Sequence, residues 1–296
     1  MAITTPTVFI LGAGVSQEYQ FPLGYELISR VLTHKPAQVE DPKQEIHFKE
    51  TLKTNACNSV DEFLENNPDF IEIGKKYIAD VLLFFENDNN LFPPTARERN
   101  FYYLLANLLE LGKIDLGENK LTILTFNYER SLEQYLLRVI KSRRRLTDNN
   151  AALEELNRLP IIHLHGSLGS FSNLVNSGRE YGVRYDGDVQ EAAKSIRIIS
   201  ESETVFPEYK TLSDIFQAAE NVYILGFGYH RLNVERLLNS GLHAKLEDNG
   251  SPRIKACRRG IDDKRWSRIV SELFRGKING RQSQATAAAF LENEYS

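Results

Sequence analysis

Four short segments carry the side chains best suited to chemistry, and each stands at the end of an apolar run. Residues 159–165 end in His165, before Gly166-Ser167, and an imidazole can act as a general base near neutral pH. Residues 121–126 lead into Asn127, whose amide can orient a hydroxyl or a water molecule. The other two runs meet glycine-rich turns, Gly12-Ala13-Gly14 and Gly226-Phe227-Gly228, which allow a close approach of backbone to a nucleotide pyrophosphate.

Each segment also has a structural explanation. A single histidine at a strand end is often a packed core residue, and both glycine segments can be plain tight turns, since Gln17 stands where a GxGxxG motif has its third glycine. Asn127 can simply close a turn. His163 shares a strand face with His165 and is a candidate partner for it. We interpret Glu129 as a first-turn acid that complements the dipole of the following helix.

Apolar runs that alternate with helical stretches must position these residues. We expect strands at residues 7–11, 121–126, 159–165, 221–225 and 253–257. This pattern predicts an α/β fold, a Rossmann-like parallel sheet with helices on both faces. Right-handed crossovers then place every strand's carboxyl end on one edge, where the glycine turns, Asn127 and His165 would gather.

Residues 44–114 lack an alternating strand pattern, and Ser59 with Glu62 resembles the start of a helix. We therefore predict a helical insertion at 44–114 within a Rossmann-like domain made of residues 1–43 and 115–296. Residues 168–192 are expected to form a loop and 195–199 a short strand. The basic run at 143–145 is interpreted as a solvated helix end, with a nucleic-acid or partner contact as the alternative.

Composition limits the function classes. The chain has 296 residues, a formal net charge of −4 and 42% hydrophobic residues, values typical of a globular protein rather than a polycation that coats nucleic acid. The sequence contains no apolar run of the ~18 residues that a membrane span needs, and its first residues do not resemble a signal peptide, so we expect a cytoplasmic protein. Two cysteines, Cys57 and Cys257, cannot supply a zinc site of four cysteines.

The motifs resemble, in order and relative position, those of the sirtuins, and most of all the sirtuin-like NAD hydrolase domains of bacterial anti-phage defence proteins. They are Gly12-Ala13-Gly14-Val15-Ser16, Thr125-Phe126-Asn127-Tyr128-Glu129, His165-Gly166-Ser167 and Gly226-Phe227-Gly228. The resemblance implies that Asn127 and His165 are catalytic. It also implies an NAD-binding set made of Gly12, Ala13, Gly14, Ser16, Thr125, Ser167, Gly226, Phe227 and Gly228.

The departures from the sirtuin pattern narrow the chemistry. Protein-deacylating sirtuins have a zinc module with four cysteine ligands, whereas this resemblance implies a helical insertion in its place and no metal. Phe21-Pro22-Leu23-Gly24 stands where those enzymes have an Asp-Phe-Arg segment after Ile-Pro, and Glu129 replaces their aspartate. Binding of a peptide substrate is therefore less expected than cleavage of NAD.

The sequence thus predicts an NAD glycohydrolase that gives nicotinamide and ADP-ribose and depletes NAD in antiviral defence. The alternatives are an NAD-dependent protein deacylase and a non-catalytic sensor of NAD or ADP-ribose. Only the arginine run at 143–145 favours direct binding of nucleic acid, which we do not expect. Unrestrained hydrolysis would harm the cell, so we expect a restrained homo-oligomer, and the resemblance suggests a separately encoded HerA-type ATPase as partner.

Overall fold

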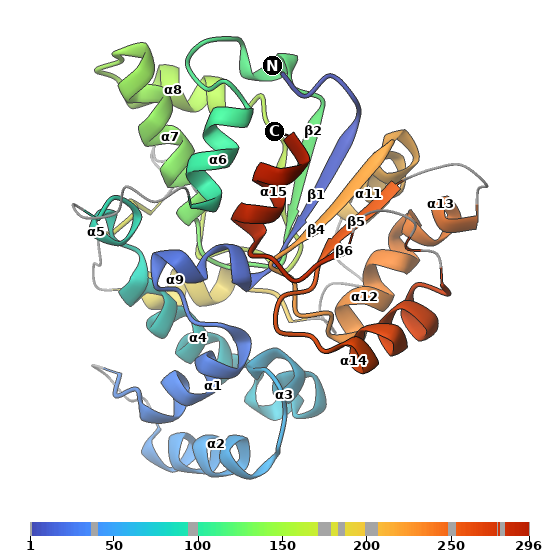
Figure 1. Cartoon of the computed structure of the whole chain (residues 1–296). Coiled ribbons are helices and arrows are strands. Elements are labelled where there is room, and N and C mark those ends of the chain that lie inside the picture. The colour runs from blue at the N-terminus through green and yellow to red at the C-terminus, as the bar shows by residue number, and fades with distance from the viewer. Residues whose placement is uncertain are drawn as a thin grey trace.

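The computed structural model contains a six-stranded, fully parallel sheet in the order β3-β2-β1-β4-β5-β6 (Figure 1). The strands are β1 (Thr7–Leu11), β2 (Leu121–Thr125), β3 (Ile161–His163), β4 (Asn221–Leu225), β5 (Arg253–Cys257) and β6 (Gln282–Ser283). This is the strand order of the Rossmann fold, so the predicted fold class is confirmed. The structure describes residues 2–36, 41–93, 100–170, 179–182, 187–198, 207–247, 253–276, 278 and 282–295.

The central strands are buried on both faces, which explains why they read as continuous apolar runs. Alternate residues of β1 enter different cores because successive side chains of a strand point to opposite faces. Phe9 and Leu11 belong to one hydrophobic cluster, and Val8 and Ile10 belong to a second. The sheet therefore separates two cores, each of which needs its own layer of helices.

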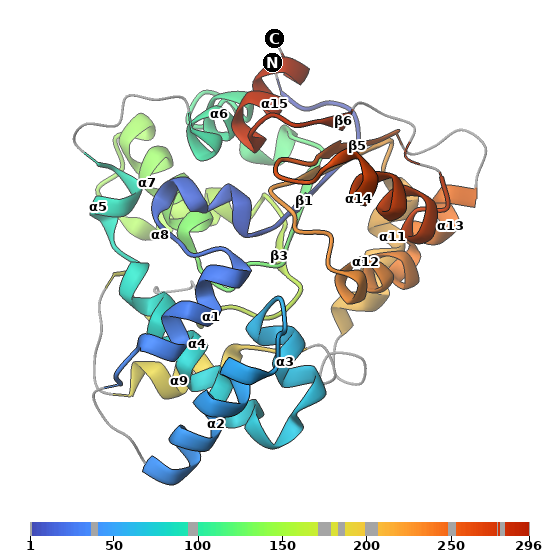
Figure 2. The same cartoon turned by 60° about the horizontal axis from the view of Figure 1, so that its bottom comes forward.

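Helices cover both faces of the sheet (Figures 1 and 2). The first core is closed by α6 (Phe101–Leu108), α7 (Ser131–Arg144) and α15 (Ala287–Tyr295), and the second by α11 (Pro207–Ala218), α12 (Arg231–Leu237) and α14 (Asp263–Arg268). A third group of helices lies beyond the carboxyl ends of the strands, at the bottom of Figure 1. It consists of α1 (Gly24–Thr33), α2 (Pro42–Thr54), α3 (Val60–Asn66), α4 (Ile71–Phe85) and α9 (Asp188–Ser195). The other α-helices in the described part of the chain are α5 (Asp88–Leu91), α8 (Asn149–Leu156) and α13 (His243–Glu247).

The start of α3 shows why this segment folds as a helix. Ser59 is the N-cap, and its hydroxyl accepts from the Glu62 N–H at 3.1 Å, as the sequence predicts. The Glu62 carboxylate does not complete a capping box, because it accepts from Asn58 N–H at 2.8 Å instead. The cap fixes the position of Asp61 in the first turn of α3.

Three local predictions differ from the structure. The third strand is shorter than expected and covers only Ile161–His163. The predicted loop at 168–192 contains the start of α9 at Asp188, and its residues 171–178 and 183–186 lie outside the described part of the chain. The predicted short strand at 195–199 is wrong in its described part, because α9 continues to Ser195 and, of residues 196–198, only Ile196 pairs, in an isolated bridge with Gly166, while residue 199 lies outside the described residues.

The basic run ends α7, as the sequence predicts. Arg143 donates to the carbonyls of Ala106 and Leu111, and Arg144 forms an ion pair with Glu155. These contacts favour the helix-end interpretation over a nucleic-acid contact.

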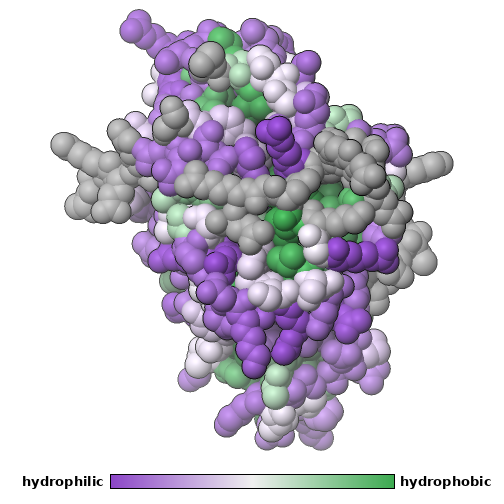
Figure 3. Space-filling view, turned by 45° about the vertical axis from the view of Figure 1, so that its right-hand side comes forward, coloured by the Kyte–Doolittle hydropathy of each residue, from purple (hydrophilic) through white to green (hydrophobic). Residues whose placement is uncertain are grey.

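The outer surface is mainly polar on the side shown in Figure 3, where the coloured residues are mostly hydrophilic with small hydrophobic areas between them. None of the helices in the described ranges is long and apolar enough to cross a membrane.

Candidate active site

The carboxyl ends of β1, β2 and β4 lie side by side because these strands pair in register. Leu11, the last residue of β1, is opposite Thr125 in β2 and Leu225 in β4. Asn127 and the two glycine turns therefore follow from three adjacent strand ends, as the parallel sheet predicts. The chain order reverses between β1 and β4, and this is the point at which open α/β sheets form a ligand-binding crevice.

The two glycine turns pack backbone against backbone. Gly12 N–H donates to Leu225 O at 3.1 Å, and Gly14 N–H donates to Gly226 O at 2.9 Å. A Cβ atom on Gly12 would lie 2.7 Å from Gly226 O, and one on Gly226, whose φ is +60°, would lie 2.5 Å from Val15 N. This close approach requires glycine at both positions.

We expect Gly226→Ala to lower the free energy of unfolding by about 2–3 kcal/mol, because the new methyl group meets backbone atoms and the left-handed conformation is strained. Urea unfolding measures this loss. Gly260→Ala is the matched control, since Gly260 also has a positive φ of +76° but no atom within 4 Å of the place that its new methyl group would occupy. Equal losses in the two variants would show that the contact between the turns contributes nothing.

The first glycine turn does not lead directly into an α-helix. It continues into two short 3₁₀ helices, Ala13–Val15 and Gln17–Tyr19, and α1 begins only at Gly24. The first glycine turn is therefore a tight turn and does not present the N-terminus of a long helix.

Asn127 is held by three neighbouring side chains. Its Nδ2 donates to Ser16 Oγ at 2.8 Å and to Glu129 Oε1 at 3.1 Å, and its backbone N–H donates to Thr125 Oγ1 at 3.1 Å. Asn127 is 8% exposed. Because both bonds from the side chain use the amide nitrogen, the amide oxygen is the atom that can accept from a substrate hydroxyl or a water molecule.

Glu129 is a buried part of this cluster, and its interpretation as a first-turn helix acid is wrong. Helix α7 begins at Ser131, two residues later, and Glu133 is the acid in its first turn. Glu129 Oε1 accepts from the hydroxyls of Ser16 and Ser131 and from the Asn127 amide. Burial raises the pKa of Glu129 to about 7, despite the Ser16 hydrogen bond that opposes the shift.

We expect this carboxyl group to make the protein less stable as the pH rises. A folded-state pKa above the unfolded value means that the native state binds the proton more tightly, so stability is lost between about pH 4.5 and 7. The loss is on the order of 3 kcal/mol. Glu129→Gln keeps the accepting oxygen and should not show this loss in urea unfolding at pH 5 and pH 8. The exposed control Glu191→Gln should behave as the wild type, and the same pH dependence in all three proteins would contradict the assignment.

His165 is buried, with 3% of its surface exposed, and its Nε2 lies 3.0 Å from Arg236 Nη1. Its ring meets the ring of Phe126 edge-on, with 5.1 Å between centroids. Burial, and then the positive charge of Arg236, lower the pKa of His165 to about 3. The imidazole is therefore uncharged at neutral pH.

His163 contacts the backbone of Asn127 and the side chain of Glu133, and the sequence did not predict these contacts. Its Nδ1 lies 2.7 Å from the backbone carbonyl of Asn127, and its Nε2 lies 2.6 Å from Glu133 Oε1. Burial alone would lower the pKa of His163, but the Glu133 carboxylate and the Asn127 carbonyl outweigh it, and the net shift is upward. His163 thus supports the Asn127 loop; the structure gives it this role rather than the predicted partnership with His165.

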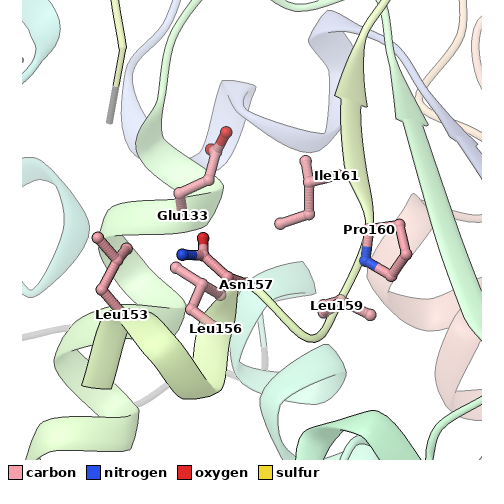
Figure 4. Close-up of a pocket in the computed structure, with 7 residues that line it drawn as sticks. All are labelled: Glu133, Leu153, Leu156, Asn157, Leu159, Pro160 and Ile161. Carbon is pink, nitrogen blue, oxygen red and sulfur yellow. The ribbon is translucent and has the colours of Figure 1, made fainter. Parts of the chain in front are cut away.

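A cavity of about 300 Å³ lies between α7, α8 and the start of β3 (Figure 4). It is lined by Glu133, Leu153, Leu156, Asn157, Leu159, Pro160 and Ile161. Glu133 connects this cavity to the Asn127 loop through His163.

The other residues of the predicted NAD-binding set lie at the same sheet edge but make different contacts. The Ser167 hydroxyl donates to Gly169 O at 3.0 Å and so closes its own turn. Phe227 is buried, with its ring centroid 5.0 Å from that of Phe126, and Gly228 is exposed. Within this set, Ser16 and Thr125 both bond to Asn127, and Gly14 bonds to Gly226.

Sequence reasoning missed several residues at the site because their partners are distant in the chain. The Tyr102 hydroxyl, from α6, lies 3.2 Å from Ser16 Oγ and 2.7 Å from Ser131 Oγ. Asp61, from α3, accepts a hydrogen bond from the Tyr128 hydroxyl. The sequence around Asp61 and Tyr102 does not predict these contacts, because they depend on how α3 and α6 pack in the folded chain.

Within the described ranges, no three His, Cys, Asp or Glu side chains are grouped as metal ligands would be. Cys257 is buried, and its Sγ donates to the carbonyl of Ala285 at 2.9 Å.

Comparison with known proteins gives a family match for one segment of the chain. Residues 121–255 match the SIR2-like domain family, a segment that includes Asn127, His165 and the second glycine turn. This segment of the chain is therefore similar to SIR2-like domains. The chain is also similar to a crystal structure of Sir2 in complex with the inhibitor EX-527, 2′-O-acetyl-ADP-ribose and a deacetylated p53 peptide. That similarity has a TM-score of 0.40 and 12% sequence identity over 97% of this chain and 91% of that chain, too loose for any residue to be equated. A search of curated proteins gives no significant match.

Proposed function

We propose that this protein hydrolyses the bond between nicotinamide and ribose in NAD, giving nicotinamide and ADP-ribose. The observation that carries the proposal is the fixed amide of Asn127, held by Ser16 and Glu129 at the carboxyl end of β2, next to the end of β1 where the strand order reverses. The match of residues 121–255 to a SIR2-like domain supports NAD as the substrate.

The reaction needs little acid catalysis. When the C–N bond to ribose breaks, its electron pair returns to the nicotinamide ring, which leaves uncharged, and the ribose becomes an oxocarbenium-like cation. Water then adds to that carbon and releases one proton, so the atoms and charges balance. The protein must hold the ribose, place the water and accept the proton.

The residues can divide these tasks. Asn127 would orient a ribose hydroxyl and the attacking water through its amide oxygen. His165 would act as the general base once its Nε2 is free of Arg236. The first glycine turn and Ser16 would lie against the pyrophosphate, with Thr125, Ser167 and the Gly226-Phe227-Gly228 turn completing the binding surface.

Hydrolysis is favoured over protein deacylation by the cysteine content, because two cysteines cannot form the four-cysteine zinc site of the deacylating sirtuins. A sensor that binds NAD or ADP-ribose without cleaving it is the third alternative. The defined contacts of the Asn127 amide favour catalysis over this role.

The buried site also suggests restraint. Asn127 and His165 are 8% and 3% exposed, so a substrate reaches them only when neighbouring groups move. We propose that a homo-oligomer imposes this restraint, which protects a cytoplasmic pool of NAD, and that a separate ATPase of the HerA type releases it in antiviral defence. An increase in turnover on addition of such an ATPase would support this, and an unchanged rate would contradict it.

One experiment distinguishes a hydrolase, a deacylase and a non-catalytic sensor. The purified chain is incubated with NAD, with and without an acetylated peptide, and the products are separated by chromatography. A hydrolase releases nicotinamide and ADP-ribose in equal amounts without the peptide. Release only in the presence of the peptide would indicate a deacylase, and NAD binding without release would indicate a sensor.

A further inference from the structure

Arg236 contacts His165 from a different part of the chain. It lies on α12, eight residues beyond the Gly226-Phe227-Gly228 turn, and is itself only 8% exposed. Its Nη1 is 3.0 Å from His165 Nε2, across a separation of 71 residues. Neither the glycine motif nor the histidine motif includes this arginine.

The direction of this hydrogen bond determines which nitrogen of the His165 ring carries the proton. A guanidinium group has only donors, so Nε2 of His165 must be the acceptor and cannot carry a proton. In an uncharged imidazole the single proton is then on Nδ1. The edge-on contact with Phe126 and the tilted contact with Tyr128, 6.0 Å between centroids, hold the plane of the ring.

Three other titratable groups near this pair are Asp61, Tyr128 and His230. Asp61 on α3 accepts from the Tyr128 hydroxyl, and burial raises the pKa of Asp61 although this hydrogen bond and the charges of His230 and Arg236 oppose the rise. Tyr128 itself is uncharged, because burial and then Asp61 raise its pKa well above the usual value. Asp61 is thus a carboxyl group near Arg236 whose burial favours its uncharged form.

We propose that Arg236 is a positioning residue for NAD hydrolysis, which holds His165 uncharged, in one ring orientation and with its proton on Nδ1. This inference rests on the proposed function. While the contact persists, Nε2 cannot take a proton, so withdrawal of Arg236 is the step that makes His165 a base. The low pKa of His165 agrees with this, since burial and the Arg236 charge both disfavour the imidazolium form.

The first test needs no substitution at Arg236. Histidine labelled with ¹⁵N is incorporated into the full chain, which has six histidines, and the His165 ring is assigned by its loss in His165→Gln. We expect the Nδ1–H form in the wild type, without protonation down to about pH 5. A Nε2–H form, or titration near the ordinary histidine pKa of about 6.5, would overturn the proposal. This measurement does not depend on NAD being a substrate, so its failure is distinct from failure of the proposed function.

The second test follows the pH dependence of nicotinamide release. Arg236→Gln keeps an N–H donor but removes the charge, so the pKa of His165 and the acid limb of the rate profile should both move up by about one pH unit or more. Arg236→Lys keeps the charge and should leave both close to the wild type. Arg231→Gln, on the exposed side of the same helix, is the matched control and should change neither. A purely structural role would lower the rate of Arg236→Gln equally at every pH without moving the limb, and that result would refute the proposal.

Discussion

Asn127→Ala and His165→Ala are each expected to reduce nicotinamide release from NAD by at least about 10²-fold. Asn127 places the reacting groups, and small misplacements in an active site cost about this much. A general base contributes about 10²–10⁴-fold, which sets the range for His165. Asn127→Asp should also be inactive, because it replaces an N–H donor by a charge next to Glu129, 3.1 Å away.

Two matched variants make this result interpretable. Asn150→Ala and His47→Ala change the same residue types at exposed positions on α8 and α2, and both should hydrolyse NAD as the wild type does. Thermal unfolding of all five variants shows whether the fold is intact. If the Asn127 and His165 variants are folded and hydrolyse NAD as fast as the wild type, the assignment of the site is wrong.

Glu86→Gln is expected to lower the free energy of unfolding by about 3–5 kcal/mol, the usual cost of breaking a buried ion pair. Glu86 accepts from Arg130 through both carboxylate oxygens, at 3.1 Å and 2.8 Å, and also pairs with Arg179. The Glu86 and Arg130 side chains are 0% and 1% exposed, so water cannot compensate for the lost charge.

The Glu86 prediction also concerns the site, because this pair joins the end of α4 to the loop that carries Asn127. Arg130 precedes α7 directly, and its backbone N–H donates to Glu86 as well. Urea unfolding measures the stability change. Glu191→Gln breaks an exposed pair with Lys194 and should cost under about 1 kcal/mol. A loss at Glu86 no larger than that at Glu191 would contradict this account.

The sheet could be predicted from the sequence because its signals are local. Four of the five predicted runs are short and end at a glycine, an asparagine or a histidine, and the parallel connections bring these ends to one edge. The two-residue strand β6 has no such signal and is not predicted. The division into an insertion at 44–114 and a Rossmann-like domain remains a prediction. Helix α6, from within that range, packs against α7 and α15 on the sheet, whereas α2 and α3 lie beyond the strand ends.

The contacts of the site could not be predicted because they depend on tertiary structure. Glu129 resembled a helix acid until the start of α7 at Ser131 placed it in the buried cluster. His163 and His165 share a strand pattern, yet one binds Glu133 and the other Arg236. The spacing of residues in the sequence does not predict either partner, because the packing of α7 and α12 near the end of β3 determines which side chain each histidine contacts.

The most direct test of the central claim is nicotinamide release under single-turnover conditions, with the purified protein in excess over NAD so that a restrained enzyme is still detected. We predict slow release of nicotinamide with an equal amount of ADP-ribose, and no release by Asn127→Ala. Release by the wild type no faster than by Asn127→Ala, with NAD recovered intact, would contradict the claim that this site cleaves NAD.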